Sequence, residues 1–438
     1  MPIRMSITHA AKLRSLGGAR VLEKRDDRRL LEAVLLLLLG VLFGLALLNA
    51  QGTGDRSQWL SYIASIHQVG VVETYVRAVF DGVGYAKTDY PGLSFAIFGL
   101  IALVGRITLL TDFEALKLSL VLFLLGCAVL MTIWQGRWRP LLGVTIFLML
   151  AINALVLVYL DVYFVFFLVF SFYCFERGKI AWGAVLFAIS FFTKWQPIIL
   201  APLILLYIVP RRFDLTHLAK LIPGALFVLV IYLLFGNALI VAFIRGTAQD
   251  LTFSGKALNF DWLVTALMEL PYLAANQGEV RSVGFDEAPE LSRGVYAYLA
   301  MLSAALRYVC YFTTILFFFF SDRSFLNLLR AAIVCFMSYF MFGHAVHENH
   351  ACLPAVLGLC WAAMDRSHTL EAVILGVMFN INIVLFYGLS GVGLGFSRVV
   401  GWDTSISLAV FNLFFFLLLW VPIARSVMAK MGELRFSK

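Results

Sequence analysis

Long apolar stretches separated by short polar segments recur from one end of the chain to the other. A membrane-crossing helix needs about 20 mostly apolar residues, and a helix satisfies its own backbone hydrogen bonds in lipid. The pattern therefore predicts an all-α polytopic membrane protein with about 12 transmembrane helices. These are expected at residues 30–50, 118–134, 140–159, 161–176, 180–194, 197–209, 218–244, 297–320, 326–343, 351–364, 369–388 and 405–425.

One further apolar stretch, residues 92–110, is treated separately. If it does not cross, the short basic loops with Arg137 and Arg139, and with Arg177 and Lys179, lie inside together with the amino terminus. This agrees with the excess of Lys and Arg in cytoplasmic loops. A single crossing would invert them, so we predict a re-entrant or interfacial segment.

This topology predicts one membrane domain, residues 30–425, between a basic cytoplasmic tail at 1–29 and a second cytoplasmic tail at 426–438. Two long segments, 51–91 and 246–296, are then external. In the first, apolar residues at helical spacing, among them Trp59 and Tyr62, predict an amphipathic helix pair lying flat at the interface. A simple surface loop is the alternative.

Composition supports the membrane assignment. Of the 438 residues, 62% are hydrophobic and 14% are charged, against roughly 25% charged in soluble domains. The net charge of +8 is carried by the segments between apolar runs, so it indicates topology, and no nucleic-acid partner is expected. The absence of Asn-x-Ser/Thr sites favours a bacterial plasma membrane over the ER membrane, which remains the alternative.

Several ionisable residues lie where apolar stretches end, and such residues are costly near lipid. Asp55 follows the first predicted helix and Asp89 precedes Tyr90 and Pro91. Partial desolvation would raise the pKa of Asp55 toward that of a general base. An interface anchor and a helix cap are the structural alternatives.

A second group combines an acid with a cation. Asp161 is followed, one helix pair later, by Lys194, with Gln196 and a proline just after it. A lysine at a helix break can hold a phosphate as a point charge with three donors, or it can extend toward water while its stem stays in lipid.

The sequence from Gly343 to His350 holds three histidines and Glu348 between two apolar stretches. The spacing of His344, His347 and His350 is conceivable for a metal, but Glu348 lies off that stripe. Imidazoles that bind a phosphate fit an external face better. In the second predicted external segment, Asn259 beside Trp262 could contact a sugar ring, or Trp262 could anchor the interface.

Taken in chain order, these motifs resemble the GT-C class of membrane glycosyltransferases. The nearest branches are GPI-mannosyltransferase-like bacterial proteins and the ER glucosyltransferases of asparagine-linked glycan assembly. The family's Tyr-Pro-Pro corresponds to Tyr-Pro-Gly at residues 90–92, and its His-Val-His-Glu-Lys-type sequence to residues 344–349. Gly92 replaces the second proline and Asn349 replaces the usual lysine.

The resemblance implies an inverting transfer of mannose or glucose from a polyprenyl- or dolichyl-phosphate donor to a glycan or glycolipid acceptor, on the non-cytoplasmic face. It implies Asp55 as base, with Asp89 and Asp161 orienting the acceptor or acting as alternates. It also implies two contact sets: Lys194, His347, Glu348, His350 and Arg398 at the donor phosphate, and Tyr90, Gln196, Asn259 and Trp262 at the substrate. It implies no metal ligand; a divalent cation, Mg²⁺ or Mn²⁺, is left open as a cofactor.

The main competing hypothesis is a transporter or flippase of lipid-linked sugars. Transporters often carry inverted halves with broken helices near the bilayer midplane, whereas the charged motifs here gather at one predicted face. A ligase or polymerase of lipid-linked glycans is the nearest enzymatic alternative, and a non-catalytic scaffold leaves the charged motifs unexplained.

Overall fold

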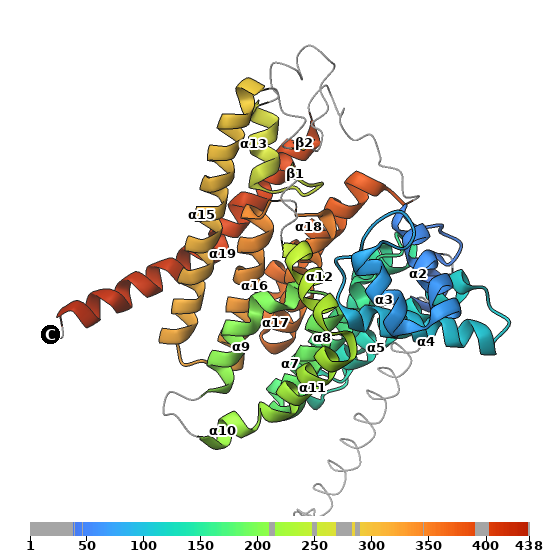
Figure 1. Ribbon diagram of the computed structural model, residues 1–438. Helices are drawn as coiled ribbons and strands as arrows, with labels where there is room; N and C mark the ends of the chain where they lie inside the picture. Colours follow the sequence, from blue (N-terminus) through green and yellow to red (C-terminus); the bar gives the residue numbers. More distant parts are fainter. Residues whose placement is uncertain are drawn as a thin grey trace, which may run out of the picture.

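The computed structural model describes residues 38, 40–45, 47–209, 215–247, 252–268, 283–284, 290–344, 346–389 and 403–436. These residues are mostly helical (Figure 1). Two very short strands, β1 (Thr252–Ser254) and β2 (Val283–Gly284), pair antiparallel with Thr252 opposite Gly284.

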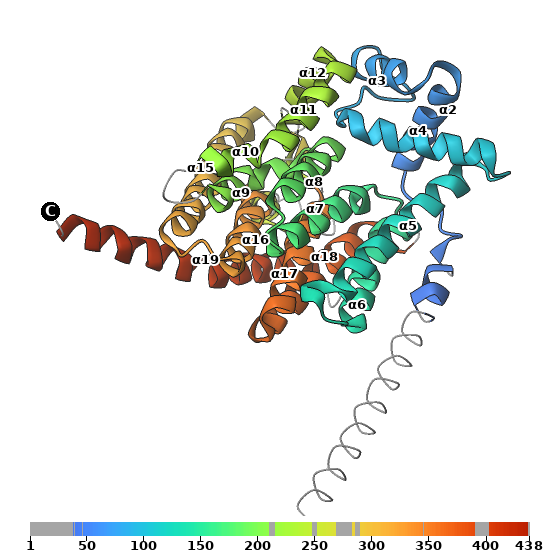
Figure 2. The same ribbon diagram turned by 90° about the horizontal axis from the view of Figure 1, so that it is seen from below.

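The amino-terminal part forms a helical group at one side of the molecule. Helices α2 (Asp55–Val69) and α3 (Val71–Phe80) are separated by Gly70 at φ 82°, and both pack against α4 (Gly92–Ile107). In Figures 1 and 2 these three helices lie together beside the rest of the bundle. The amphipathic segment predicted from Trp59 and Tyr62 is therefore a pair of helices.

The central and carboxyl-terminal parts form the helical bundle. In chain order its helices are α5 (Asp112–Thr132), α6 (Pro140–Ala151), α7 (Asp161–Glu176), α8 (Ile180–Thr193), α9 (Ala201–Ile208), α10 (Leu215–Ala219), α11 (Ile222–Phe235), α12 (Asn237–Thr247), α13 (Phe260–Met268), α15 (Glu290–Phe320), α16 (Phe325–Phe342), α17 (Cys352–Met364), α18 (Thr369–Tyr387) and α19 (Thr404–Phe436). Neighbours in the chain pack as pairs: α5 with α6, α7 with α8, α15 with α16, and α17 with α18.

Several long apolar helices are compatible with a multi-pass membrane protein. Within the described ranges, five are long and apolar enough to cross a bilayer, or six if the pair α11 and α12, bent by 101°, forms one span. The five are Asp112–Gly136, Gly294–Phe320, Phe325–Phe342, Arg366–Tyr387 and Thr404–Leu434. About half of the first predicted span, 30–50, lies outside the described residues, and the count of about 12 stays a prediction.

Breaks within the apolar stretches account for much of the difference. The stretch 140–159 leaves the α-helical pattern in a π-turn at Ile152–Val156, and the stretch 197–209 begins as a 3₁₀ turn at Gln196–Leu200. Hydropathy reports that a stretch is apolar, but it does not report where the helix breaks.

The stretch 92–110 forms a single helix. Helix α4 has 16 residues, which at about 1.5 Å per residue makes roughly 24 Å, less than the roughly 30 Å of bilayer hydrocarbon. Its backbone does not turn back, so it is not a re-entrant hairpin. The interfacial placement stays a prediction.

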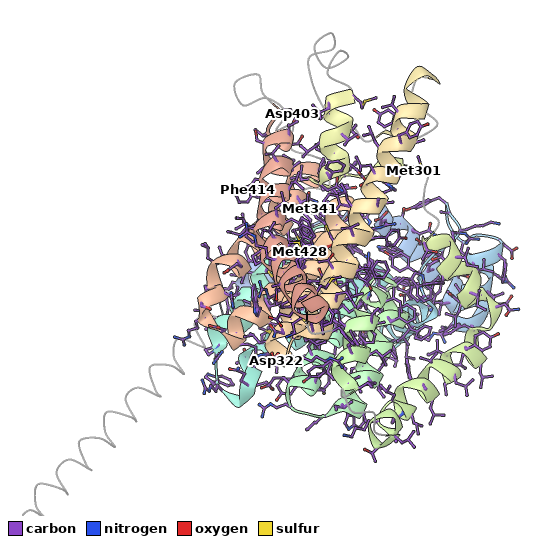
Figure 3. All side chains as sticks on the ribbon, turned by 90° about the vertical axis from the view of Figure 1, so that its left-hand side faces the viewer. Met301, Asp322, Met341, Asp403, Phe414 and Met428 are labelled. Atoms are coloured by element: carbon purple, nitrogen blue, oxygen red, sulfur yellow. The ribbon has the colours of Figure 1, made fainter. Side chains whose placement is uncertain are left out.

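Exposed apolar side chains cover the outer face of the bundle. Met301, Phe414 and Met428 are each more than half exposed, whereas Met341 is fully buried (Figure 3). In the same view Asp403 and Asp322 lie toward opposite ends of the bundle. An apolar belt between polar ends is what a bilayer requires of a helical protein.

Candidate functional site

The break between α6 and α7 positions two of the polar side chains. They are Asp161 and, through the segment that packs on the break, Asp55. After the π-turn at Ile152–Val156, Val158 adopts φ 60°, which is a rare conformation for a β-branched residue. Helix α7 then begins at Asp161, which is 1% exposed. Strained backbone that is held by its surroundings is common at functional sites.

The segment before α2 packs directly on this break. The Thr53 amide donates to the Leu157 carbonyl at 3.1 Å. Gly52, at φ 79°, lies so close that a Cβ there would be 2.6 Å from Cγ2 of Val158. The glycine thus allows the chain to cross the break and carry Asp55 to its place at the start of α2.

We expect Gly52→Ala to destabilise the protein by about 1–3 kcal/mol, because the new Cβ overlaps Val158 and alanine is strained at positive φ. Gly54→Ala is the matched control, since Gly54 has φ −55° and no atom within 4 Å of its virtual Cβ. Thermal unfolding in detergent measures both variants. Equal stability of the two would show that the close approach at Gly52 is not required.

Asp55 lies within electrostatic range of the other candidate side chains. Burial raises the pKa of Asp55, while the charges of His347 and Lys194 lower it in part. The hydroxyl of Tyr85, an exposed residue, lies 3.5 Å from Oδ1 of Asp55. Asp55 is therefore a half-buried carboxyl with raised basicity, as a general base requires.

Asp89 lies in a turn that is held in place through its backbone. The Trp195 Nε1 donates to the Asp89 carbonyl at 2.6 Å, and the Arg245 guanidinium donates to the Thr88 carbonyl at 2.8 Å. Burial raises the pKa of the Asp89 carboxyl, and Lys194, His347 and Arg245 oppose that shift. Asp89 thus shares the electrostatic environment of Asp55.

Pro91 and Gly92 continue this turn into α4. A Cβ on Gly92 would lie 2.6 Å from the ring of Phe235, so the position that carries a second proline in the GT-C pattern here needs a glycine. Tyr90 packs edge-on against Trp59 at 5.1 Å between ring centroids and interacts electrostatically with all three acids.

Asp161 is saturated with donors. Lys194 forms an ion pair with its Oδ1, and the side-chain amides of Asn153 and Asn349 each donate to Oδ2 at 2.9 Å. Both carboxylate oxygens of Asp161 are thus engaged by donors of the protein itself. Asp161 is better suited to holding Lys194 and Asn349 than to acting as a base. The Asn349 amide donates to Asp161 at the position where the GT-C pattern has a lysine.

The turn between α16 and α17 presents Glu348 and His347. The Tyr159 hydroxyl donates to Oε1 of Glu348 at 2.7 Å, while Oε2 is buried and has no hydrogen bond among the described residues. Burial raises the pKa of Glu348 to about 7. Near neutral pH a large share of Glu348 is therefore protonated, which reduces its repulsion of a nearby anion.

His347 and His350 differ in their surroundings. The His347 side chain is exposed, but protein atoms surround it and displace much of its water. This desolvation, together with the charge of Lys194, lowers the pKa of His347. The His350 ring stacks on Tyr339 at 5.7 Å, with Nδ1 3.4 Å from the tyrosine hydroxyl. His347 is thus presented to a ligand, whereas His350 is engaged by Tyr339.

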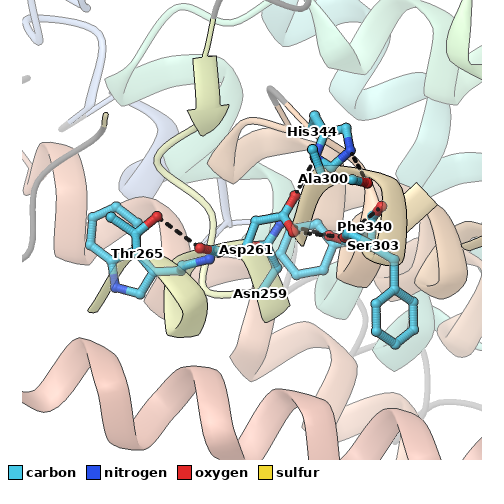
Figure 4. A network of polar contacts seen from close by, with 9 residues as sticks. Asn259, Asp261, Thr265, Ala300, Ser303, Phe340 and His344 are labelled. Carbon is cyan, nitrogen blue, oxygen red and sulfur yellow. Dashed lines mark hydrogen bonds and ion pairs between the residues drawn. The ribbon is translucent and has the colours of Figure 1, made fainter. Parts of the chain in front are cut away.

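His344 belongs to a different network, on the side of the turn that faces α13 and α15. Its Nδ1 lies 2.8 Å from Oδ2 of the buried Asp261, its Nε2 lies 2.9 Å from the Ala300 carbonyl, and Ser303 donates to Oδ1 of Asp261 at 2.7 Å (Figure 4). The three histidines therefore do not converge. Across the described ranges, no group of three His, Cys, Asp or Glu is placed to hold a metal ion.

The His344–Asp261 pair should make the stability of the protein depend on pH. Burial opposes the charged imidazole, but the hydrogen bond and charge of Asp261 outweigh it and raise the pKa of His344. The pair therefore adds stability below the unfolded pKa of about 6.5 and loses it as pH rises through the higher folded value. We expect His344→Gln to lower the melting temperature more at pH 6 than at pH 8.5. An equal loss at both pH values would contradict a charged His344.

Asn259 and Trp262 serve the fold, which differs from the expectation that they contact a sugar. Asn259 accepts from the Trp262 amide at 3.0 Å and donates to the Phe340 carbonyl at 3.0 Å, so it caps α13. Trp262 is 2% exposed, and its Nε1 donates to Ser405 at 2.8 Å. Each side chain is buried, and its polar atoms are used in contacts within the fold.

Gln196 and Arg398 are the remaining residues that were expected to contact the substrate or the donor phosphate. Gln196 lies beside Lys194, and its Oε1 is buried without a hydrogen bond among the described residues, so it retains an acceptor for a ligand. Arg398 and much of the segment 246–296 lie outside the described residues.

Lys256 is a cation at this site that the sequence reasoning missed. Its Nζ lies 4.7 Å from the ring centroid of Tyr387, and its charge acts on both His347 and Glu348. Tyr387 in turn packs edge-on against Tyr159. The available signal was that Lys256 is the one lysine in the predicted external segment 246–296.

The site thus combines two carboxyls of raised pKa, Asp55 and Asp89, with the cations Lys194 and Lys256 and a presented imidazole, His347. These come from α2, the turn before α4, the break between α8 and the 3₁₀ turn at Gln196–Leu200, the turn before α13 and the turn before α17. No protein-family model matches this chain, and no curated protein matches it as a relative.

Proposed function

We propose that this protein is an inverting GT-C-type glycosyltransferase. It moves a hexose, mannose or glucose, from a polyprenyl- or dolichyl-phosphate donor to a lipid-linked or glycan acceptor. The reaction takes place on the non-cytoplasmic face of a membrane, and the absence of Asn-x-Ser/Thr sites favours a bacterial plasma membrane.

The observation that carries the proposal is the juxtaposition of Asp55 with Lys194 and His347. Each of these two groups acts electrostatically on the Asp55 carboxyl. Transfer from a phosphate-linked sugar needs a base for the acceptor hydroxyl and positive charge or donors for the departing phosphate. A flippase needs the second feature, and only one that is coupled to protons would also need a carboxyl of raised basicity.

In this mechanism Asp55 takes the proton of the acceptor hydroxyl. The freed oxygen attacks the anomeric carbon from the face opposite the phosphate, forming the glycosidic bond. The bond from that carbon to the phosphate oxygen breaks with its electron pair, and the lipid phosphate departs. One direct displacement inverts the anomeric centre, and Asp55 afterwards returns its proton to water.

The departing phosphate gains negative charge, and three side chains are suited to stabilise it. Lys194 and Lys256 supply fixed positive charge, and His347 supplies an N–H donor. Asp161 acts on this step indirectly, as a positioning residue that holds the Lys194 ammonium.

Asp89 and Tyr90 are placed to orient the acceptor or the sugar. The Asp89 turn is fixed by Trp195 and Arg245, so its carboxyl is held rigidly relative to Lys194. A preorganised group of this kind raises the rate by holding the reacting atoms at attack distance.

The test is reconstitution of the purified protein in liposomes with labelled polyprenyl-phosphate mannose or glucose and a lipid-linked acceptor extract. We expect a new glycosidic product whose anomeric configuration is opposite to that of the donor. Movement of the labelled donor between leaflets without any glycosidic product would instead identify a flippase.

A further inference from the structure

A groove lined mostly by apolar side chains lies away from the candidate site. It is a groove of about 1570 Å³ between α6 and α18, larger than the roughly 300–1,000 Å³ of common small-molecule pockets. Its walls are apolar side chains of these two helices, including Leu148 and Val373. It is continuous in its lining with a smaller polar space of about 500 Å³, since both contain Arg137, Arg139 and Arg366.

The position of the groove follows from the helices that form it. Arg139 precedes α6 and Arg366 precedes α18, whereas Asp161 and Tyr387 lie at the other ends of these helical segments. Helix α18 has 19 residues, or roughly 28 Å. The arginines and the candidate site are thus separated by about one bilayer thickness.

The arginines form a concentrated positive charge at the mouth of the groove. Arg139 is held by the Ala363 carbonyl and by Gln135, and the charges of Arg137 and Arg366 both act on it. Arg137 and Arg366 are exposed, and in the part of the chain that the structure describes no hydrogen bond or ion pair engages either guanidinium. Glu176 also lines the polar space, but Arg177 pairs with it at 3.2 Å. The three arginines therefore remain to accept an anion with several oxygens.

The apolar part of the groove has the length of a single leaflet. It runs along α18 from Thr369 to Asn380, roughly 16 Å, and half of a bilayer's hydrocarbon is roughly 15 Å. Asn380 closes the inner end by donating to the Met149 carbonyl of α6 at 3.2 Å. Trp138 at the mouth is 59% exposed, as is typical of an aromatic residue at headgroup level.

From this geometry we infer that the groove binds an anionic phospholipid, with its phosphate on Arg137, Arg139 and Arg366 and an acyl chain along α6 and α18. The occupant is a lipid of the leaflet opposite the candidate site. Neither an apolar chain alone nor a free anion uses both halves of the space. Binding here is independent of the sugar-transfer proposal.

The test is native mass spectrometry of the full-length protein in detergent with added lipid. Phosphatidylglycerol and phosphatidylcholine with identical chains are compared, and glycerol phosphate represents the headgroup alone. The charge variant is Arg137→Gln with Arg366→Gln, and the charge-matched control is Arg425→Gln with Lys430→Gln in α19. The groove is filled by Thr145→Trp with Val373→Trp, against Leu229→Trp on the exposed face of α11.

We expect retained phosphatidylglycerol to fall roughly 10- to 30-fold in the arginine variant, since each arginine near anionic lipid contributes about a factor of five. The tryptophan pair should also reduce it, and both controls should behave as the unmodified protein. Equal retention of the two lipids, or no loss in the arginine variant, would overturn the inference. So would effective competition by glycerol phosphate together with normal binding in the tryptophan pair, because these indicate a free-anion site.

Discussion

We expect Asp55→Asn to abolish transfer from a lipid-linked sugar while leaving the protein folded and inserted. An amide cannot accept the acceptor's proton, and loss of a positioned base lowers the rate roughly 100- to 10,000-fold. The side chain is half-buried and its hydrogen bond with Tyr85 is long, at 3.5 Å, so the substitution removes little structural support. The measurement is product formation in liposomes, with the melting temperature as the check on folding.

Asp81→Asn is the matched control, since Asp81 is an exposed acid in the same predicted external segment. It should retain the activity of the unmodified protein. If Asp55→Asn turns over at a near-normal rate, Asp55 is not the base, and Asp89→Asn becomes the variant to examine.

The second large effect is expected at Lys194. Lys194→Gln removes the cation at the departing phosphate, and removal of one such stabilising group costs roughly 100- to 1,000-fold in turnover. It also leaves the buried Asp161 carboxylate without its ion pair, which in buried pairs costs about 3–5 kcal/mol. The remaining bonds from Asn153 and Asn349 soften that loss.

The double variant Asp161→Asn with Lys194→Gln separates the two roles of Lys194. Removing both charges eliminates the unpaired carboxylate, so the melting temperature should recover most of its loss. Activity should stay low, because the phosphate still lacks its cation. Recovery of activity together with stability would assign Lys194 a purely structural role.

Much of the site could be predicted because polar residues are rare in such an apolar chain. Asp55, Asp161, Lys194 and His347 stand out for that reason, and the structure places them within electrostatic range of one another. The helix pair α2–α3 was likewise visible from the spacing of its apolar residues. These are properties of local composition, which a sequence displays directly.

The parts that could not be predicted depend on direction and on breaks in helices. Residues three apart in one turn have different surroundings, so His347 is exposed while His344 bonds to Asp261. Asn259 and Trp262 have the residue types of a sugar contact, but their polar atoms are used within the fold. Lys256 could not be recognised from the sequence because the residues on which it acts, Tyr387 and Glu348, are distant from it in the chain.

The central claim is that the acids and the histidine turn share one face of the membrane. It is tested most directly by labelling single cysteines at Tyr85, His347 and Arg137 with a membrane-impermeant thiol reagent, applied to either side of sealed vesicles. The six native cysteines are buried, which keeps the background low. We predict that Tyr85→Cys and His347→Cys react from the non-cytoplasmic side and Arg137→Cys from the cytoplasmic side. Labelling of Tyr85→Cys and His347→Cys from opposite sides would contradict the account.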